Sequence, residues 1–271
     1  MQPARLSAPD LRPIHLRADP NGLAYDVQSE TLYVADGNTG AIVRVRGDTQ
    51  QRIATIPSEG VAADRLAGLA VTPYGTLYVT RVGYGTSGAV IRIDPDGSYE
   101  ALPNLPADLY RVGITYDPHQ HVLYVTQFRK SRHGTTGGMV IEIDLSDDYV
   151  SPLVEGFVKP VGVARLGDAL VVADAGQRAL FTVDLTAGAR KVHKVPVEID
   201  RPDSLCALAD SLLVTTYDAD RRFGALRRVW LDGRITTLAQ GPWEPRGVDT
   251  DGRYAFVSAR RASRILVFEI T

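Results

Sequence analysis

Cysteine is nearly absent from this chain of 271 residues. The one thiol, Cys206, has no second cysteine with which to form an internal disulfide, and its neighbours 204–208 are typical of a buried strand. The sequence therefore gives no sign of a fold that depends on an oxidising compartment.

Long apolar runs are missing as well. No segment approaches the roughly 18 apolar residues of a membrane-spanning helix. Residues 1–17 mix Pro, Arg, Asp and Ser with isolated leucines, and so lack the apolar core of a signal peptide. We therefore expect a cytoplasmic protein with no membrane partner.

Neither sign of charge dominates. The chain has 30 basic and 32 acidic residues, which gives a formal net charge of −2. Nucleic-acid-binding surfaces usually show an excess of Lys and Arg, so nucleic acid is not expected as a partner. Hydrophobic residues make up 44% of the chain, which is enough to form a core.

Helical apolar spacing is also lacking over any useful length, and a repeated strand pattern is present instead. In the first copy the pattern covers residues 20–26, 32–36 and 41–45. It returns clearly twice and then more faintly three times, with anchor positions at 22, 68, 113, 162, 204 and 247. Successive anchors are 46, 45, 49, 42 and 43 residues apart, so six copies account for nearly the whole chain.

Each copy consists of short β-branched and aromatic runs separated by Gly, Asp and Pro turns, which indicates strands. A fourth, weaker run lies between copies, at residues 51–56, 99–102, 191–197 and 234–238. Four antiparallel strands at this period are typical of a propeller blade. The sequence therefore predicts an all-β fold, a six-bladed β-propeller that forms one domain over residues 1–271.

The ends of the chain suggest how the ring closes. The sixth copy ends after its third strand, residues 264–269, while residues 11–16 precede the first copy. We expect this N-terminal segment to supply the missing outer strand, because closure of this kind protects blade edges.

Two rings of side chains are expected at one mouth of the central channel, because the first strand of a blade starts where the antiparallel second strand ends. The first ring precedes each anchor: Asn21, Ala67, Val112, Val161, Asp203 and Arg246. The second ring ends each second strand: Asp36, Arg81, Gln127, Asp174, Thr216 and Ala259.

The first ring is lopsided. Blades two to four contribute small or apolar groups, whereas Asp203, Arg246 and Asn21 come from blades five, six and one. A mouth that is half apolar and half polar suits a small organic ligand. The alternative is that Asp203 and Arg246 form an ion pair in a wet channel and bind nothing.

Loops above this mouth supply further candidates, since loops on a rigid scaffold often carry function. Blade three has a long connection over residues 128–138 that contains His133. This side chain can act as a base near neutral pH, but a histidine in a loop rich in Gly, Ser and Thr is more often simply solvated. Blade five contributes residues 217–223. The predicted substrate-binding residues, from these loops and the second ring, are Arg81, Gln127, His133 and Tyr217.

Two phrases resemble a known family. Residues 20–24 followed by 32–36 are similar to the SMP-30/gluconolactonase family, and residues 202–206 are similar to its Pro-Asp-Gly phrase. The blade pattern also resembles the NHL-repeat propellers. The resemblance implies a six-bladed propeller and a metal-dependent hydrolase that opens lactones.

The resemblance also implies a divalent cation (Ca, Zn or Mn) in the channel, with Asn21 and Asp203 as ligands. The cation would polarise a carbonyl and activate water. Asp36 and Asp174 would supply the missing oxygens from the second ring, an assignment that the family's phrases do not themselves predict. This chain departs from the family in lacking its Glu-Gly-Pro phrase and in placing Arg246 between Asn21 and Asp203. A fixed positive charge there opposes a bound cation, so the protein would hold one divalent ion or none.

Three functions stay open. The first is a lactonase-type hydrolase with Asp203 and Arg246 as the predicted catalytic residues. The second is a metal-free enzyme or ligand-binding propeller in which Arg246 holds an anionic small molecule, because guanidinium binds carboxylate in a bidentate manner. The third is a non-catalytic, NHL-like platform for protein partners.

Overall fold

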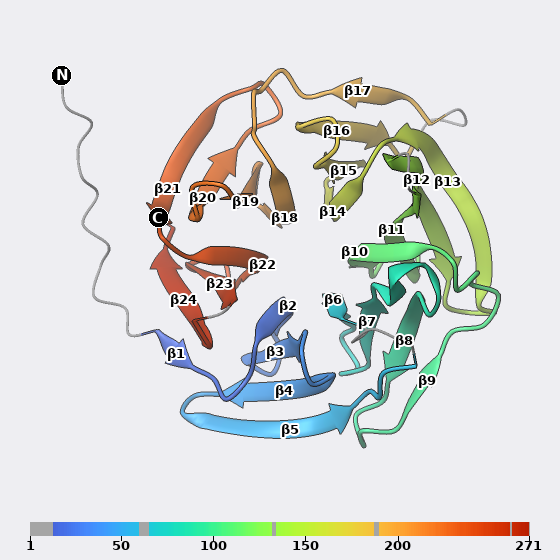
Figure 1. The fold of residues 1–271 in the computed structure, drawn as a ribbon, viewed down its shortest axis with the longest axis vertical. Coiled ribbons are helices and arrows are strands. Elements are labelled where there is room, and N and C mark those ends of the chain that lie inside the picture. Colours follow the sequence, from blue (N-terminus) through green and yellow to red (C-terminus); the bar gives the residue numbers. More distant parts are fainter. Residues whose placement is uncertain (1–12, 60–64, 132–133, 187–189, 261, 271) are drawn as a thin grey trace.

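A computed structural model describes residues 13–59, 65–131, 134–186, 190–260 and 262–270. Six four-stranded antiparallel sheets surround a central channel, which confirms the predicted six-bladed β-propeller (Figure 1). In each sheet the strands follow one another outward from the channel, and in the last sheet the N-terminal strand takes the outer position.

The strands of each blade have the following bounds. Blade one contains β2 (Pro20–Asp26), β3 (Thr31–Asp36), β4 (Ala41–Arg46) and β5 (Thr49–Thr55). Blade two contains β6 (Leu66–Val71), β7 (Leu77–Arg81), β8 (Ala89–Ile93) and β9 (Tyr99–Ala101), with a short 3-10 turn η1 (Gly83–Gly85). Blade three contains β10 (Tyr110–Asp117), β11 (Val122–Ser131), β12 (Gly134–Asp144) and β13 (Tyr149–Phe157).

The second half of the chain repeats this order. Blade four contains β14 (Pro160–Leu166), β15 (Ala169–Asp174), β16 (Ala179–Asp184) and β17 (Val192–Lys194). Blade five contains β18 (Pro202–Leu208), β19 (Ser211–Asp218), β20 (Phe223–Val229) and β21 (Ile235–Gly241). Blade six contains β22 (Glu244–Thr250), β23 (Tyr254–Arg260), β24 (Arg264–Glu269) and β1 (Ile14–His15).

The N-terminal strand closes the ring as the sequence predicted. Ile14 pairs with Ile265 and His15 pairs with Arg264 in an antiparallel ladder between β1 and β24. Leu16, which follows, is 6% exposed and packs in an apolar cluster with Ile265. Residues 11 and 12 of the predicted strand lie outside the described residues.

The predicted long loop of blade three is instead a strand extension. β11 and β12 continue as a hairpin in which Arg129 pairs with Thr136 and Lys130 pairs with Thr135. The polar and glycine-rich composition of residues 128–138 suggested a connection, but the backbone ladder persists because each strand satisfies the hydrogen bonds of the other. Residues 132 and 133 lie outside the described part.

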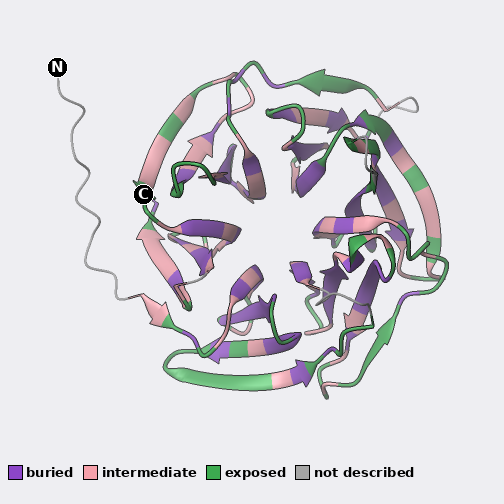
Figure 2. Cartoon of the chain, in the orientation of Figure 1, coloured by how far each residue is buried: buried purple, intermediate pink, exposed green. Residues whose placement is uncertain are grey.

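The core lies between blades, not within one. Figure 2 shows buried residues concentrated on the inner strands, while outer strands such as β5 are largely exposed. One apolar cluster joins Ile42 of blade one with Leu77 and Ile91 of blade two. Burial of the two faces of each inner strand explains their apolar sequences.

The anchor glycines let neighbouring blades approach closely. A methyl group at Gly22 would lie 1.7 Å from the carbonyl oxygen of Ala67 in the next blade. At Gly247 it would lie 2.7 Å from the carbonyl oxygen of Asn21, across the junction that closes the ring. These glycines are therefore required by the spacing of the blades.

Hydroxyl groups next to the second ring link blades to one another. The Ser258 hydroxyl accepts a hydrogen bond from Gly247 N at 2.6 Å and donates one to Asn21 O at 2.5 Å. Thr215 bridges Ser204 N (3.0 Å) and Arg246 O (3.2 Å) in the same way. These contacts hold the first strands, and with them the channel mouth, in a fixed arrangement.

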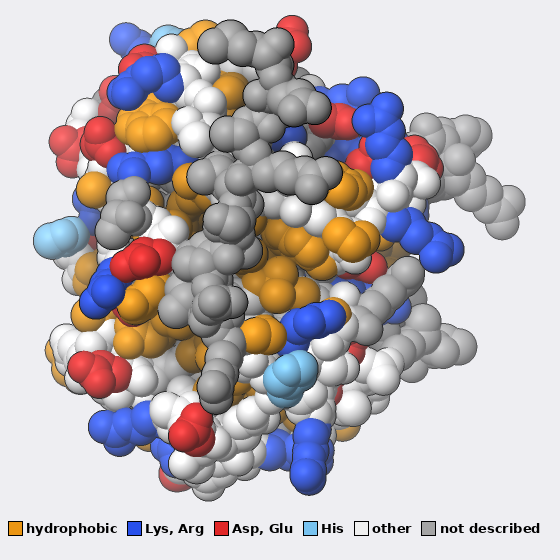
Figure 3. All heavy atoms as spheres, turned by 90° about the vertical axis from the view of Figure 1, so that its left-hand side faces the viewer, with side chains coloured by type: hydrophobic (Ala, Val, Ile, Leu, Met, Phe, Trp, Pro, Cys, Tyr) orange, Lys and Arg blue, Asp and Glu red, His pale blue; other side chains and the backbone are white. Residues whose placement is uncertain are grey.

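The outer surface of the described residues intersperses acidic and basic side chains on the side of β21 and β24 (Figure 3). Among the described residues, no helix has the length and apolar composition that a membrane crossing requires.

Candidate functional site

The first strands of all six blades line a central cavity of about 570 Å³. Asn21 of β2, Asp203 of β18 and Arg246 of β22 all line this cavity. Because β22 packs against both β18 and β2, the three polar side chains are brought together at one mouth. This volume falls within the range of small-molecule sites.

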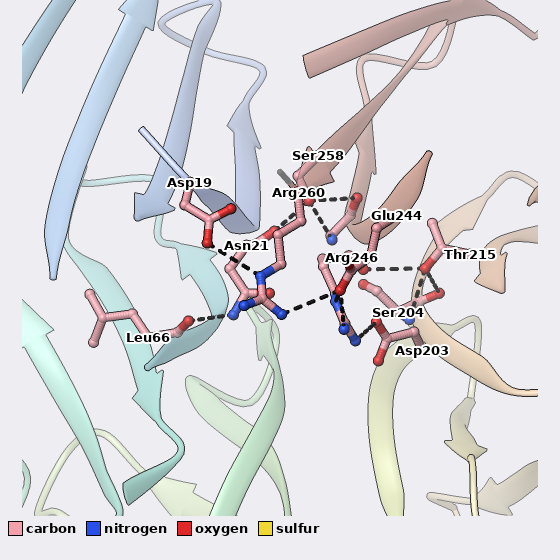
Figure 4. Close-up of polar contacts among 11 residues, drawn as sticks. Asp19, Asn21, Leu66, Asp203, Ser204, Thr215, Glu244, Arg246, Ser258 and Arg260 are labelled. Carbon is pink, nitrogen blue, oxygen red and sulfur yellow. Dashed lines mark hydrogen bonds and ion pairs between the residues drawn. The ribbon is translucent and has the colours of Figure 1, made fainter. Parts of the chain in front are cut away.

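Arg246 forms two ion pairs at this mouth (Figure 4). Its Nη1 atom lies 2.9 Å from Asp203 Oδ2. On the other side its Nε and Nη2 atoms donate to Glu244 Oε1 at 3.1 and 2.5 Å. The charge of Asp203 raises the pKa of Arg246 above its ordinary value, and Glu244 raises it further against the opposing effect of burial. The guanidinium is therefore permanently charged.

A second guanidinium completes this group. Arg260 Nη1 lies 3.3 Å from Glu244 Oε1, and Arg260 Nε lies 3.3 Å from Asp19 Oδ2. The ladder between β22 and β23 places Glu244 directly opposite Arg260. We call the five residues Asp19, Asp203, Glu244, Arg246 and Arg260 the arginine cluster.

Sequence reasoning missed Glu244 and Arg260. Glu244 precedes Arg246 by two residues, and residues i and i+2 of a strand share a face, so the pair could have been recognised. Nothing in the sequence pairs Arg260 with Glu244, because their contact depends on the register of β22 against β23.

Aromatic side chains line the other side of the mouth. Tyr110 and Phe128 stack with centroids 5.2 Å apart, and Tyr84 meets Tyr110 edge-on at 5.9 Å. All three line the cavity, on blades two and three. β10, which carries Tyr110, lies across the channel from β22 (Figure 1). We call Tyr84, Tyr110 and Phe128 the aromatic shelf.

Two members of the predicted second ring cap turns. Asp36 accepts hydrogen bonds from Asn38 N (2.8 Å) and from the Thr39 hydroxyl (2.6 Å). Asp174, which is fully buried, accepts from Val158 N at 2.7 Å and Lys159 N at 2.9 Å. Neither side chain lines the cavity, since each folds back onto a turn beside its own strand.

Three of the predicted substrate-binding residues, Arg81, Gln127 and Tyr217, do not line the cavity. Arg81 is 4% exposed and pairs with Glu59 at 2.8 Å. Gln127 is also buried, and the structure gives its Oε1 atom no hydrogen-bond partner among the described residues. Tyr217 touches the site indirectly, with its ring centroid 6.0 Å from Arg246 Cζ. His133 lies outside the described residues.

The described residues do not fit a divalent cation in the channel. Asn21 donates from Nδ2 to Leu66 O at 2.6 Å, and Asp203 already pairs with a guanidinium. The carboxylates of Asp36 and Asp174 are occupied by hydrogen bonds from nearby turns. No cluster of three His, Cys, Asp or Glu side chains in the described ranges could hold a metal ion. Two guanidinium groups lie where a cation would need carboxylate oxygens around it.

Comparison with known proteins supports the resemblance seen in the sequence. The model of the SMP-30/Gluconolactonase/LRE-like region matches residues 15–129, which confirms the predicted resemblance. No curated protein sequence matches the chain.

Solved structures share the fold at low sequence identity. A gluconolactonase from Xanthomonas campestris aligns with a TM-score of 0.77 and 14% identity, covering 96% of this chain and 88% of that one. A PQQ-bound aldose sugar dehydrogenase from Streptomyces coelicolor aligns at 0.72 and 16%, covering 98% and 99%. A virginiamycin B lyase from Staphylococcus aureus aligns at 0.66 and 16%, covering 96% and 99%. At such identities the likeness shows the fold, on which three different activities are found.

Proposed function

We propose that the protein is a small-molecule hydrolase of the lactonase type in which Arg246, not a divalent cation, binds the reacting carbonyl. The family match over residues 15–129 and the likeness to a gluconolactonase support this class of reaction. The observation that carries the proposal is the charged guanidinium of Arg246, held in the channel between Asp203 and Glu244.

Two N–H groups of Arg246 are left to bind a substrate. A guanidinium carries five N–H groups. The contacts with Asp203 and Glu244 use three of them, one on each nitrogen. The other two have no partner among the described residues. They would donate to the carbonyl oxygen of a bound lactone and stabilise the oxyanion that forms in the transition state.

Asp203 would act as the base. Its carboxylate lies in the cavity, 2.9 Å from the same guanidinium, so a water beside it would face a carbonyl held by Arg246. Asp203 accepts a proton as the water oxygen bonds to the carbonyl carbon. The tetrahedral intermediate then collapses, the ring C–O bond breaks, and the proton passes to the leaving alkoxide. The product is a hydroxy acid.

A second candidate is a binding protein for small carboxylates without turnover. The same observation favours it, because a guanidinium with two unassigned N–H groups recognises carboxylate well. The two candidates differ only in whether Asp203 transfers a proton.

The test is hydrolysis of a lactone panel, followed by proton release and by NMR. We expect activity that EDTA does not reduce, and a loss of about 100-fold in kcat for Arg246→Gln and for Asp203→Asn. Arg92→Lys serves as a control, since Arg92 pairs with Glu100 at 2.6 Å outside the channel. Activity that requires added calcium, zinc or manganese would contradict the proposal. Carboxylate binding without turnover would establish the second candidate.

A further inference from the structure

We infer that the channel mouth takes a two-part ligand, with a carboxyl or lactone group at the arginine cluster and a flat ring against the aromatic shelf. This inference rests on the proposed function and narrows it to a substrate class, namely lactones and hydroxy acids that carry an aromatic ring. The aromatic part of this inference comes from the geometry of blade two and not from the family resemblance.

The aromatic shelf is accessible from the cavity. Tyr84 is 40% exposed, whereas Phe128 at its other end is 3% exposed and anchors the stack. Rings in such arrangements prefer offset-stacked or edge-to-face partners. Val112 and Val161 extend the apolar lining beside them. A ligand ring placed here would gain aromatic contacts that a saturated chain would not.

Tyr84 is held in an unusual backbone conformation. Its φ and ψ angles are 47° and 30°, in the left-handed region that non-glycine residues seldom adopt. The flanking turn is closed by hydrogen bonds from Thr86 N and Ser87 N to Gly83 O, at 2.9 and 3.2 Å. A methyl group at Gly83 would lie 1.9 Å from Gly88 N, so the turn is also tightly packed.

Two buried arginines donate hydrogen bonds to backbone oxygens at the end of this turn. Arg81 Nε donates to Ser87 O at 2.7 Å, and Arg111 Nη1 donates to Gly88 O at 2.8 Å. Arg111 is fully buried, and burial lowers its pKa to about 10, so it is still charged at neutral pH. Arg81, which the sequence predicted to bind substrate, is on this geometry a positioning residue for Tyr84.

Strain of this kind persists where the surroundings over-determine it, and it concentrates at ligand sites. Tyr84 lies at the rim of the cavity and is held there by three features. They are the hydrogen bonds from Arg81 and Arg111, the closed turn, and the close contact between Gly83 and Gly88. The aromatic shelf lies on blades two and three, whereas the arginine cluster lies on blades one, five and six. The two halves therefore offer one ligand an aromatic wall, next to which Arg65 and Lys130 also line the cavity, and an anion-binding wall at the same mouth.

The test uses matched carboxylates. Phenyl-substituted acids, from benzoate to 4-phenylbutanoate, are compared by calorimetry with cyclohexyl acids of equal chain length and with the neutral phenyl amides. We expect the phenyl acid to bind about three- to tenfold more tightly than its cyclohexyl counterpart, the range of an aromatic contact. The amides should bind at least tenfold more weakly than the acids.

The variant Tyr84→Leu keeps an apolar side chain and the same backbone strain. It should remove the preference for phenyl acids and leave cyclohexyl binding unchanged. Tyr99→Leu is the matched control, because Tyr99 is 45% exposed on the outer strand β9. If Tyr84→Leu does not fold by circular dichroism, Tyr110→Leu takes its place.

The outcomes separate the two proposals. Equal binding of phenyl and cyclohexyl acids, both weakened by Arg246→Gln, would overturn the aromatic subsite and support the proposed function. Failure of every acid to bind, or binding that ignores Arg246→Gln, would overturn both. A phenyl preference that survives in the Tyr84 and Tyr110 variants would overturn the role of the shelf.

Discussion

The guanidinium groups of Arg246 and Arg260 share one carboxylate oxygen, Glu244 Oε1. Arg246 Nη2 lies 2.5 Å from it and Arg260 Nη1 lies 3.3 Å from it. The Glu244 side chain is 6% exposed, so a buried negative charge joins two positive ones across β22 and β23. This bridge holds Arg246 in place at the wall of the cavity.

Removal of that negative charge should destabilise the protein. In Glu244→Gln the two guanidiniums stay close without a shared counter-charge, and loss of one member of a buried ionic group costs about 3 kcal/mol. For a chain of this size that corresponds to a fall in Tm of roughly 6–12 °C. Glu100→Gln removes an exposed pair with Arg92 and should change the free energy of unfolding by less than about 0.5 kcal/mol. A Glu244→Gln variant as stable as the wild type would show that the bridge is dispensable.

Chelation should leave the protein unchanged. Because guanidinium groups lie where a cation would be bound, EDTA should not lower the Tm, and millimolar calcium should not raise it. A ligand that binds the folded state always stabilises it, so a thermal melt is a sensitive measurement. Elemental analysis of protein purified without chelator should find calcium, zinc and manganese well below one ion per chain. One ion per chain together with a Tm that EDTA lowers would refute the metal-free site.

Asp249 should make stability depend on pH. Burial raises the pKa of Asp249 to about 6, against the hydrogen bonds it accepts from Tyr25 N and Thr250 N at 2.8 and 2.9 Å. The folded protein therefore holds this proton more tightly than the unfolded chain does. Stability is greatest below about pH 4 as far as this group is concerned, falls as the pH rises to about 6, and is level above that. The loss amounts to about 2–3 kcal/mol.

Urea unfolding between pH 4 and pH 7 measures that loss. Asp249→Asn should remove this part of the pH dependence, because the amide cannot ionise and its oxygen can still accept from Tyr25 N. Asp210→Asn is the control, since the Asp210 side chain is 71% exposed on the surface. If Asp249→Asn and the wild type show the same pH dependence, Asp249 is ionised throughout this range.

The anchor position of blade one should tolerate no side chain, although the equivalent position of blade five is Ser204. In Gly22→Ala the added methyl group would lie 1.7 Å from Ala67 O, so blades one and two would have to separate. We expect a loss of about 3 kcal/mol in the free energy of unfolding. Gly47→Ala, where no atom lies within 4 Å but φ is +54°, should show only the backbone effect of about 1 kcal/mol. Comparable losses in the two variants would mean that the blades can adjust.

The architecture could be predicted because its signals are local. Strand runs such as residues 32–36, turn residues and a period in the forties are each visible within one repeat, and every repeat obeys the same pattern. Even the closing strand followed from a count of strands at the two ends of the chain. Asn21, Asp203 and Arg246 were placed at one mouth for the same reason, since each precedes a repeat anchor.

The rest of the site depended on contacts between distant residues. Asp36 and Asp174 end their strands as predicted, but their side chains satisfy nearby backbone N–H groups and do not enter the cavity. The Glu244–Arg260 pair required the register of β22 and β23, and the clamp of Arg81 and Arg111 on the Tyr84 turn required the packing of blade two against blade three. The sequence by itself determined the propeller and the ring of first-strand side chains, because strand pattern and turn chemistry are local. Only the tertiary structure decided which charges pair and which rings face the channel, because those depend on how neighbouring strands and blades come together.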